Sequence, residues 1–144
     1  MGSKISEVMS SDVCSVQSSD SIKTVAKVMA DKDMGFLPVV EGQKLVGAVT
    51  DRDIVVRGIA MGQNGDTSIQ DIMSRDVKSV GQDDDFATAV KTMGDAQLRR
   101  LPVIDADNNL VGVVSLADAA REKDPAVAGA ALGEVTQPGG SNAT

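Results

Sequence analysis

A hydroxyl and a carboxylate recur three residues apart at two places in the chain. Thr50 precedes Asp53 and Ser115 precedes Asp118, and a largely apolar run comes directly before each hydroxyl. We expect each run to be a strand and each hydroxyl to begin a helix, whose free N–H groups and partial positive charge suit a phosphate. The carboxylate can accept hydrogen bonds from two neighbouring hydroxyl groups, such as those of a ribose. The spacing is therefore compatible with a nucleotide site.

The same spacing is also typical of plain helix capping. A hydroxyl followed three residues later by an acid is close to a capping box, in which each side chain accepts from the backbone N–H of the other residue. Each hydroxyl also follows a glycine by three residues, and Gly47 and Gly112 would let a ligand come close to the strand. One pair alone favours capping, whereas two pairs in equivalent settings favour binding.

The two pairs belong to a repeat that covers most of the chain. The segment 37–53 recurs as 101–118 with one residue added in the turn between its apolar runs, and apolar positions upstream also match. Two copies of about sixty residues are fewer than a solenoid needs, so a duplicated domain with internal pseudo-symmetry is expected. We expect repeat 1 at 1–60, a linker at 61–67, repeat 2 at 68–123 and a partly disordered C-terminal tail at 124–144.

Each copy predicts a helix, a strand, a second helix, a hairpin and a last helix. The expected ranges are 4–9, 13–16, 21–32, 36–40 and 45–49 in the first copy, and 69–73, 77–80, 85–96, 101–104 and 110–114 in the second. Pro38 and Pro102 lack an N–H, so we expect them at a strand start or a solvent-facing edge. The predicted fold is α+β, with two β-α-β-β-α units related by a pseudo-twofold axis in one compact module.

Composition argues against several classes of partner. The formal net charge of −7 disfavours nucleic acid, and no run approaches the ~18 apolar residues of a membrane span. The single cysteine, Cys14, cannot form an internal disulfide. We expect a cytoplasmic protein with no nucleic acid and no membrane partner.

The residues offer little for catalysis. The chain has no histidine, which excludes a Ser-His-Asp triad and a histidine metal site. Cys14 has no imidazole to activate it, so we interpret it as a small wall residue. The acidic run 83–85 precedes a predicted helix and is interpreted as charge at its N-terminus. We predict that the protein is not an enzyme, with no catalytic residue, no metal site and no required cofactor.

The doubled corner resembles that of the CBS-domain pair, a regulatory module that binds adenosyl ligands. The resemblance covers roughly 4–121 and depends on the pattern G-x-x-[T/S]-x-x-D at 47–53 and 112–118, each behind a Leu-Pro-Val run. The chain is most similar to the small stand-alone pairs of bacteria, which carry no attached enzyme or channel. The resemblance implies two clefts between the halves for AMP, ADP, ATP or S-adenosylmethionine, and a homodimer packed through helices into a flat disc.

Each cleft implied by the resemblance is composite, with the hydroxyl and acid from one copy and the backbone around the Leu-Pro-Val run from the other. The first cleft would join Thr50, Arg52 and Asp53 to Lys78, Arg99, Arg100 and Leu101. The second would join Ser115 and Asp118 to Cys14, Ser15, Gly35, Phe36 and Leu37.

These two clefts differ in charge. The first gathers three arginines, which bind phosphate strongly, whereas Gly35 and Phe36 replace Arg99 and Arg100 in the second. We expect the nucleotide mainly in the first cleft, with the second weak, empty or suited to a less anionic adenosyl ligand. The alternative for Arg99 and Arg100 is that they pair with surface acids.

Three functions remain open. The leading hypothesis is a sensor that transmits ligand occupancy as a conformational change to an unknown effector protein. The alternatives are a ligand-independent homodimeric scaffold with vestigial clefts, and a hydrolase or transferase acting on the adenosyl ligand. Apolar positions in the last helix of each copy fit either a dimer contact or cover for their own sheet; they are Ile54, Val55, Ile59, Ala117, Ala119 and Ala120.

Overall fold

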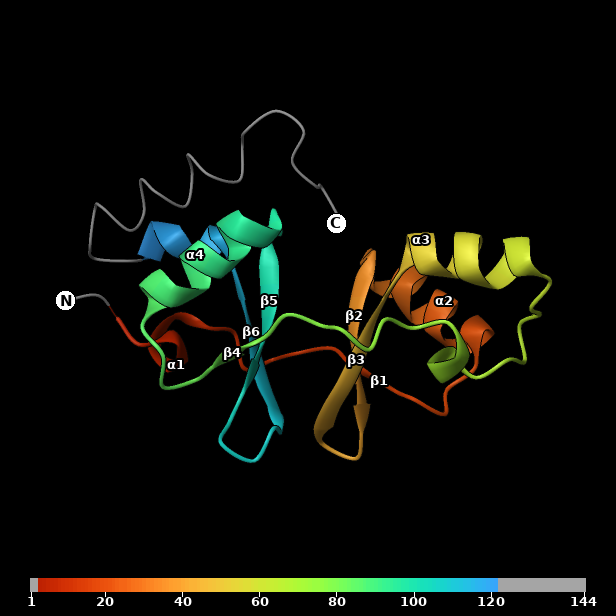
Figure 1. Cartoon of the computed structure of the whole chain (residues 1–144), viewed down its shortest axis with the longest axis horizontal. Helices are drawn as coiled ribbons and strands as arrows, with labels where there is room; N and C mark the ends of the chain where they lie inside the picture. The colour runs from red at the N-terminus through yellow and green to blue at the C-terminus, as the bar shows by residue number, and fades with distance from the viewer. Residues whose placement is uncertain (1–2, 122–144) are drawn as a thin grey trace. The chain divides into compact units, whose positions relative to one another are not determined.

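The chain folds as two compact units, each with its own sheet and core (Figure 1). This computed structural model describes residues 3–121. The continuous unit runs from Cys14 to Val77, whereas the split unit combines the chain up to Val13 with the chain from Lys78 onward. Each unit has helices and a three-stranded sheet, which confirms the predicted α+β fold of two similar halves.

The continuous unit contains the sheet β1-β2-β3. Its elements are β1 (Val16–Gln17), α2 (Ile22–Lys32), β2 (Phe36–Glu41), β3 (Lys44–Thr50), α3 (Asp51–Asp53), the π-helical η1 (Ile54–Gly58) and two 3-10 turns, η2 (Ile59–Met61) and η3 (Ile69–Asp71). The central strand β2 is parallel to β1 and antiparallel to β3. Buried apolar side chains of α2, η1 and η3 pack with those of β2 and β3 in one core.

The split unit repeats this arrangement with the sheet β4-β5-β6. Its elements are α1 (Ile5–Val8), β4 (Val80–Gly81), α4 (Phe86–Ala96), β5 (Arg100–Ile104), β6 (Leu110–Ser115) and the 3-10 helix η4 (Leu116–Arg121). Its core consists of Ile5, Val8, Val80, Phe86, Ala89, Val90, Met93, Leu101, Val103 and Val114. Both hairpins lie where the sequence predicts them, because an apolar run and a turn fix their ends.

The two long helices begin within one residue of their expected starts. The Ser21 hydroxyl accepts the Thr24 N–H at 3.1 Å and caps α2. Asp85 precedes α4 without a side-chain cap, and the Phe86 N–H donates instead to the Ser3 carbonyl at 2.7 Å. A backbone carbonyl of the N-terminal segment therefore satisfies a free N–H at the start of α4, as the Ser21 hydroxyl does at the start of α2.

The first helix of the chain packs on the split unit, rather than on the repeat that follows it in sequence. The Ile5 N–H donates to the Asp84 carbonyl at 2.8 Å. Ser10 and Val113 exchange two backbone hydrogen bonds, each 2.9 Å long. Ile5 is also buried in the core of this unit.

The equivalent segment of the second repeat packs on the continuous unit. Ile69, Ile72 and Met73 are buried in its core, and Ala48 exchanges backbone hydrogen bonds of 2.9 and 2.8 Å with Ser74. Each unit thus takes its first helical turn from the other repeat. The chain crosses between units after residues 13 and 77, whereas the segment 61–67, expected as the linker, lies within the continuous unit.

The prolines occupy a different place from the one expected. Pro38 is buried in the middle strand of its sheet, opposite Ala48. The backbone N–H and C=O of Ala48 both bond to Ser74 on the other side of β3, so Ala48 and Pro38 form a pair without hydrogen bonds. On the other side of β2, β1 pairs only with Val39 and Val40, beyond Pro38. Pro102 has the equivalent position in β5. Neither position requires the missing N–H.

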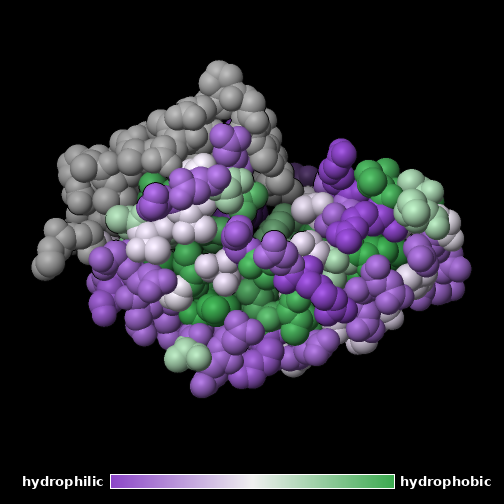
Figure 2. All heavy atoms as spheres, viewed as in Figure 1, coloured by the Kyte–Doolittle hydropathy of each residue, from purple (hydrophilic) through white to green (hydrophobic). Residues whose placement is uncertain are grey.

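The helical segment after β3 has one buried and one exposed apolar face. Ile54 belongs to the core of its own unit, whereas Val55 and Ile59 are 59% and 60% exposed and Met61 is 71% exposed. Apolar surface is visible there in Figure 2. Ile54 therefore packs in the core of its own unit, whereas a dimer contact through Val55 and Ile59 stays a prediction.

Some predictions lie beyond the described residues or between the units. The expected tail at 124–144 and the side chains of Ala119 and Ala120 lie outside the description, and the pseudo-twofold relation of the halves stays a prediction. Among the described helices, none has the length and hydropathy needed to span a lipid bilayer.

Candidate functional site

The first corner lies where β3 ends and α3 begins. The Thr50 hydroxyl accepts the Asp53 N–H at 3.1 Å, and Asp53 Oδ2 accepts the Thr50 N–H at 2.9 Å. The capping box considered from the spacing is therefore formed. The Asp53 side chain is still 20% exposed, so the capped carboxylate remains partly open to solvent and keeps lone pairs for another donor.

The second corner lies between β6 and η4 and is closed more tightly. Asp118 Oδ2 accepts the Ser115 N–H at 2.7 Å, and the Ser115 hydroxyl lies 3.5 Å from the same oxygen. Asp118 is buried, with 6% of its surface exposed. Both corners thus pair a hydroxyl residue with an acid, but the acid of the first corner is partly exposed whereas that of the second is buried.

The glycines before these corners make room for protein rather than for a ligand. A Cβ atom added to Gly47 would lie 2.6 Å from the Ser74 carbonyl oxygen and 2.9 Å from Met73 Sδ, and one added to Gly112 would lie 2.6 Å from Met9 Sδ. Met9 directly follows α1, and Met73 and Ser74 lie two and three residues beyond η3, so these neighbours belong to the segment that each unit takes from the other repeat. The prediction that the glycines admit a ligand is wrong, because the exchanged segment already fills that space.

Strand pairing brings predicted site residues of the continuous unit together. Phe36 pairs with Thr50 across β2 and β3, and the Asp51 N–H donates to the Gly35 carbonyl at 3.0 Å. The start of the Leu-Pro-Val run is thereby fixed beside the first corner.

The split unit repeats this contact with charged residues. Arg100 pairs with Ser115 across β5 and β6, and the Leu116 N–H donates to the Arg99 carbonyl at 2.9 Å. The Nε atom of Arg100 is buried and has no hydrogen-bond partner among the described residues. A buried donor left without a partner costs about 1–3 kcal/mol, which an incoming acceptor would recover.

The remaining predicted residues differ in what they can offer. Leu37 and Leu101 are fully buried in their cores, so only their backbone can serve a ligand. Cys14 is half-buried against the core of the continuous unit, as a wall residue would be. Ser15 and Arg52 are exposed.

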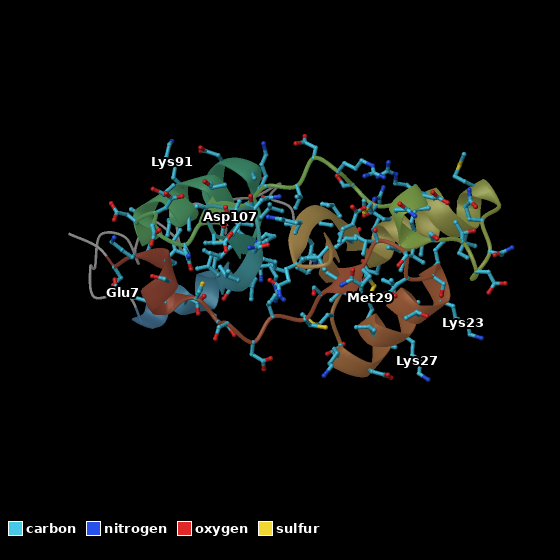
Figure 3. All side chains as sticks on the ribbon, turned by 90° about the horizontal axis from the view of Figure 1, so that it is seen from below. Glu7, Lys23, Lys27, Met29, Lys91 and Asp107 are labelled. Atoms are coloured by element: carbon cyan, nitrogen blue, oxygen red, sulfur yellow. The ribbon has the colours of Figure 1, made fainter. Side chains whose placement is uncertain are left out.

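Lys78 lines a shallow cavity of about 270 Å³ in the split unit, together with Thr92, Asp95 and Ala96 at the end of α4. Asp95 pairs with Lys91, whose Nζ lies 3.4 Å from Asp95 Oδ2. Lys91 extends outward from α4 in Figure 3.

The predicted site residues divide between the units. The continuous unit holds Cys14, Ser15, Gly35, Phe36, Leu37, Thr50, Arg52 and Asp53, and the split unit holds Lys78, Arg99, Arg100, Leu101, Ser115 and Asp118. Each composite cleft implied by the resemblance takes residues from both units, so the composition of the clefts stays a prediction. Within the described residues, no group of three or more His, Cys, Asp or Glu side chains is arranged to hold a metal ion.

Sequence reasoning missed one charged residue at the first corner. Arg57 Nη1 lies 4.0 Å from Asp53 Oδ1, across one helical turn. The signal was present in the sequence, since an acid followed four residues later by a base is a favourable helical pair.

Comparisons with known proteins agree with this architecture. The CBS domain-containing protein YhcV of Bacillus subtilis is 36% identical over 135 residues, which cover 93% of this chain and 96% of that protein. A crystal structure of Hypoxic Response Protein I with two coordinated zinc ions is 32% identical, with a TM-score of 0.74, and covers 83% of this chain and 98% of that one.

A crystal structure of the CBS domain pair of protein MJ0100, in complex with 5′-methylthioadenosine and S-adenosyl-L-methionine, is 27% identical. Its TM-score is 0.68, and the match covers 83% of this chain and 98% of that one. The family model of the CBS domain matches this chain twice, at residues 5–58 and 69–124. The chain belongs to the CBS domain family, as a tandem pair of CBS domains.

Proposed function

We propose that this CBS pair is a regulatory module that binds an adenosyl ligand, either an adenine nucleotide or S-adenosylmethionine, and passes its occupancy to an effector protein as a conformational change. The observation that carries the proposal is the first corner, where Asp53 is held in place by Thr50 and is still partly exposed. An acid held in this way can accept hydrogen bonds from the two ribose hydroxyl groups.

The charge near the Leu-Pro-Val run of the split unit supports an anionic ligand. Arg100 has a buried Nε–H without a partner among the described residues, and arginine is well suited to phosphate. Arg99 and Arg100 would meet an anionic group of the ligand, and Asp53 would accept from its ribose. The second cleft would bind more weakly, since Asp118 is buried against Ser115.

The similar CBS pair of MJ0100 also supports an adenosyl compound as the ligand. The CBS pair of MJ0100 is described with two adenosyl compounds, and its match extends over nearly the whole of that chain. We propose that the present protein takes an adenosyl ligand as a regulator and carries out no reaction on it.

We also propose that the protein acts as a homodimer. Val55, Val56, Ile59 and Met61 expose apolar side chains on one helical segment of the continuous unit, and a second copy packed against this segment would cover them. The same surface favours a second candidate function, a dimeric scaffold that works without ligand.

Thermal unfolding with and without AMP, ATP and S-adenosylmethionine separates the two functions. A sensor melts at a higher temperature when its ligand is present, because ligand that binds only the native state stabilises it. A melting temperature that none of the adenosyl compounds raises would support the scaffold instead.

A further inference from the structure

We infer that Arg57 offsets the charge of Asp53 and makes the first corner prefer anionic over neutral or cationic adenosyl ligands. This inference rests on the proposed function and adds to it a residue outside the G-x-x-[T/S]-x-x-D pattern, four positions beyond the acid.

The geometry leaves Asp53 able to bind while its charge is offset. Asp53 Oδ2 is held by the Thr50 N–H at 2.9 Å, and Asp53 Oδ1 lies 4.0 Å from Arg57 Nη1. A separation of 4.0 Å is an ion pair without a hydrogen bond, so Oδ1 keeps its capacity to accept from a ligand hydroxyl. The Arg57 side chain is 53% exposed and is therefore free to turn toward an incoming anion.

The backbone that carries Arg57 is anchored to the core. Arg57 lies in the π-helical turn η1, between buried Ile54 and buried Gly58. A Cβ atom at Gly58 would lie 3.4 Å from Ile22 Cδ1 and 3.5 Å from Ile72 Cδ1, so this side of the turn is close-packed. The packing holds the Cα of Arg57 one turn beyond Asp53 and directs its side chain to the surface.

The sequence repeat provides an internal comparison. Aligned on the two corners, the residue of the second repeat that corresponds to Arg57 is Glu122, which lies outside the described residues. The first repeat thus pairs its acid with a base, whereas the second has another acid at the same position.

Exposed ion pairs contribute little to stability, so the effect of Arg57 must be measured on ligand choice rather than on folding. At low ionic strength and without divalent metal, a unit charge about 6 Å away changes affinity roughly threefold per ligand charge in water. Adenosine is neutral, AMP and ADP are increasingly negative, and S-adenosylmethionine carries a net positive charge.

The experiment measures dissociation constants of adenosine, AMP, ADP and S-adenosylmethionine by calorimetry for the full chain and for Arg57→Gln and Arg57→Lys. We expect Arg57→Gln to change the dissociation constant of adenosine by less than about twofold. The dissociation constant of AMP should rise at least threefold and that of ADP more, whereas that of S-adenosylmethionine should fall. Arg57→Lys keeps the charge and should keep the wild-type ratios between the dissociation constants. Lys27→Gln is the matched control, since it removes one charge from the outward face of α2 (Figure 3).

The outcomes separate the inference from the function on which it rests. Equal losses for adenosine and ADP, or unchanged ratios between the dissociation constants of the four ligands in Arg57→Gln, would overturn the inference and leave the sensor intact. If the wild-type protein binds none of the four compounds, the proposed function is refuted and the inference falls with it. Should Arg57→Gln fail to fold, wild-type ratios of the dissociation constants in Arg57→Lys together with a salt-sensitive preference for ADP over adenosine support the inference, and a salt-independent preference refutes it.

Discussion

Ser10 and Val113 exchange two backbone hydrogen bonds of 2.9 Å, although they come from opposite ends of the described chain. Ser74 and Ala48 make the equivalent pair in the continuous unit. Both pairs join the segment after a short first helix to the last strand of a sheet. Each compact unit is therefore completed by the other sequence repeat, and neither repeat contains all the residues of one core.

The first prediction concerns fragments of the chain. A fragment of residues 14–77 should fold by itself, because it holds the whole continuous unit, whereas a fragment of residues 1–60 should not. The shorter repeat lacks Ile69 and Ile72, which are buried in that core, and losing one such side chain costs about 2–5 kcal/mol of a total of about 5–15 kcal/mol. Cooperative thermal unfolding by circular dichroism is the measurement. A cooperative transition for 1–60 and none for 14–77 would contradict the exchange of segments.

The hairpins and the long helices of both units could be predicted from the sequence, but the exchange of the first helical segments could not. The first strands were predicted less well, since those expected at 13–16 and 77–80 are the two-residue strands Val16–Gln17 and Val80–Gly81. Apolar runs, turns and caps are local, so the hairpins and the long helices lie within one or two residues of their expected ranges. The first helix of each repeat is short and apolar on one side, and either sheet offers it an apolar face. Nothing along the sequence states which of the two it covers.

The glycines before the corners give a second prediction. Gly47→Ala should lower the free energy of unfolding by about 1–3 kcal/mol, the usual range for overpacking. Its Cβ would lie 2.6 Å from the carbonyl oxygen of Ser74, a backbone atom that is fixed by pairing with Ala48. Denaturant unfolding is the measurement.

Gly58→Ala is the matched control in the same unit. Its Cβ would come no closer than 3.4 Å to the flexible end of Ile22, so stability should change by less than about 1 kcal/mol, the range of the glycine-to-alanine difference in helices. Equal losses from Gly47→Ala and Gly58→Ala would show that the exchanged segment does not set the requirement for glycine.

At the corners, the sequence pattern predicts both capping and binding; the structure shows the capping contacts, and the binding role of these residues stays a prediction. The spacing of Thr50 and Asp53 taken alone favours a capping box over a ligand site, and the structure forms the capping box. A carboxylate has more lone pairs than the cap uses, so capping fixes the acid without preventing binding. Partial exposure separates Asp53 from Asp118, and this depends on packing that no spacing reveals.

The third prediction tests the exposed helical surface. Ile59→Glu should convert a dimer into a monomer, because it places a charge among Val55, Val56 and Met61, which the dimer would bury. Light scattering after size-exclusion chromatography gives the mass. Ala30→Glu, on the exposed face of α2, should leave the mass unchanged. A monomeric wild-type protein would refute the homodimer.

The fourth prediction ranks the two corners. At one hundred times its dissociation constant, a ligand raises the free energy of unfolding by roughly 2.7 kcal/mol, which a melting curve resolves easily. Asp53→Ala should abolish this shift, because the partly exposed carboxylate is the proposed ribose acceptor. Asp118→Ala should leave most of the shift, although it removes an acceptor of the Ser115 N–H and lowers the melting temperature of the free protein as loss of a cap does. Each variant is therefore compared with its own ligand-free curve. If the ligand-induced shift is lost equally in both variants, the corners contribute alike, and the preference for the first one is wrong.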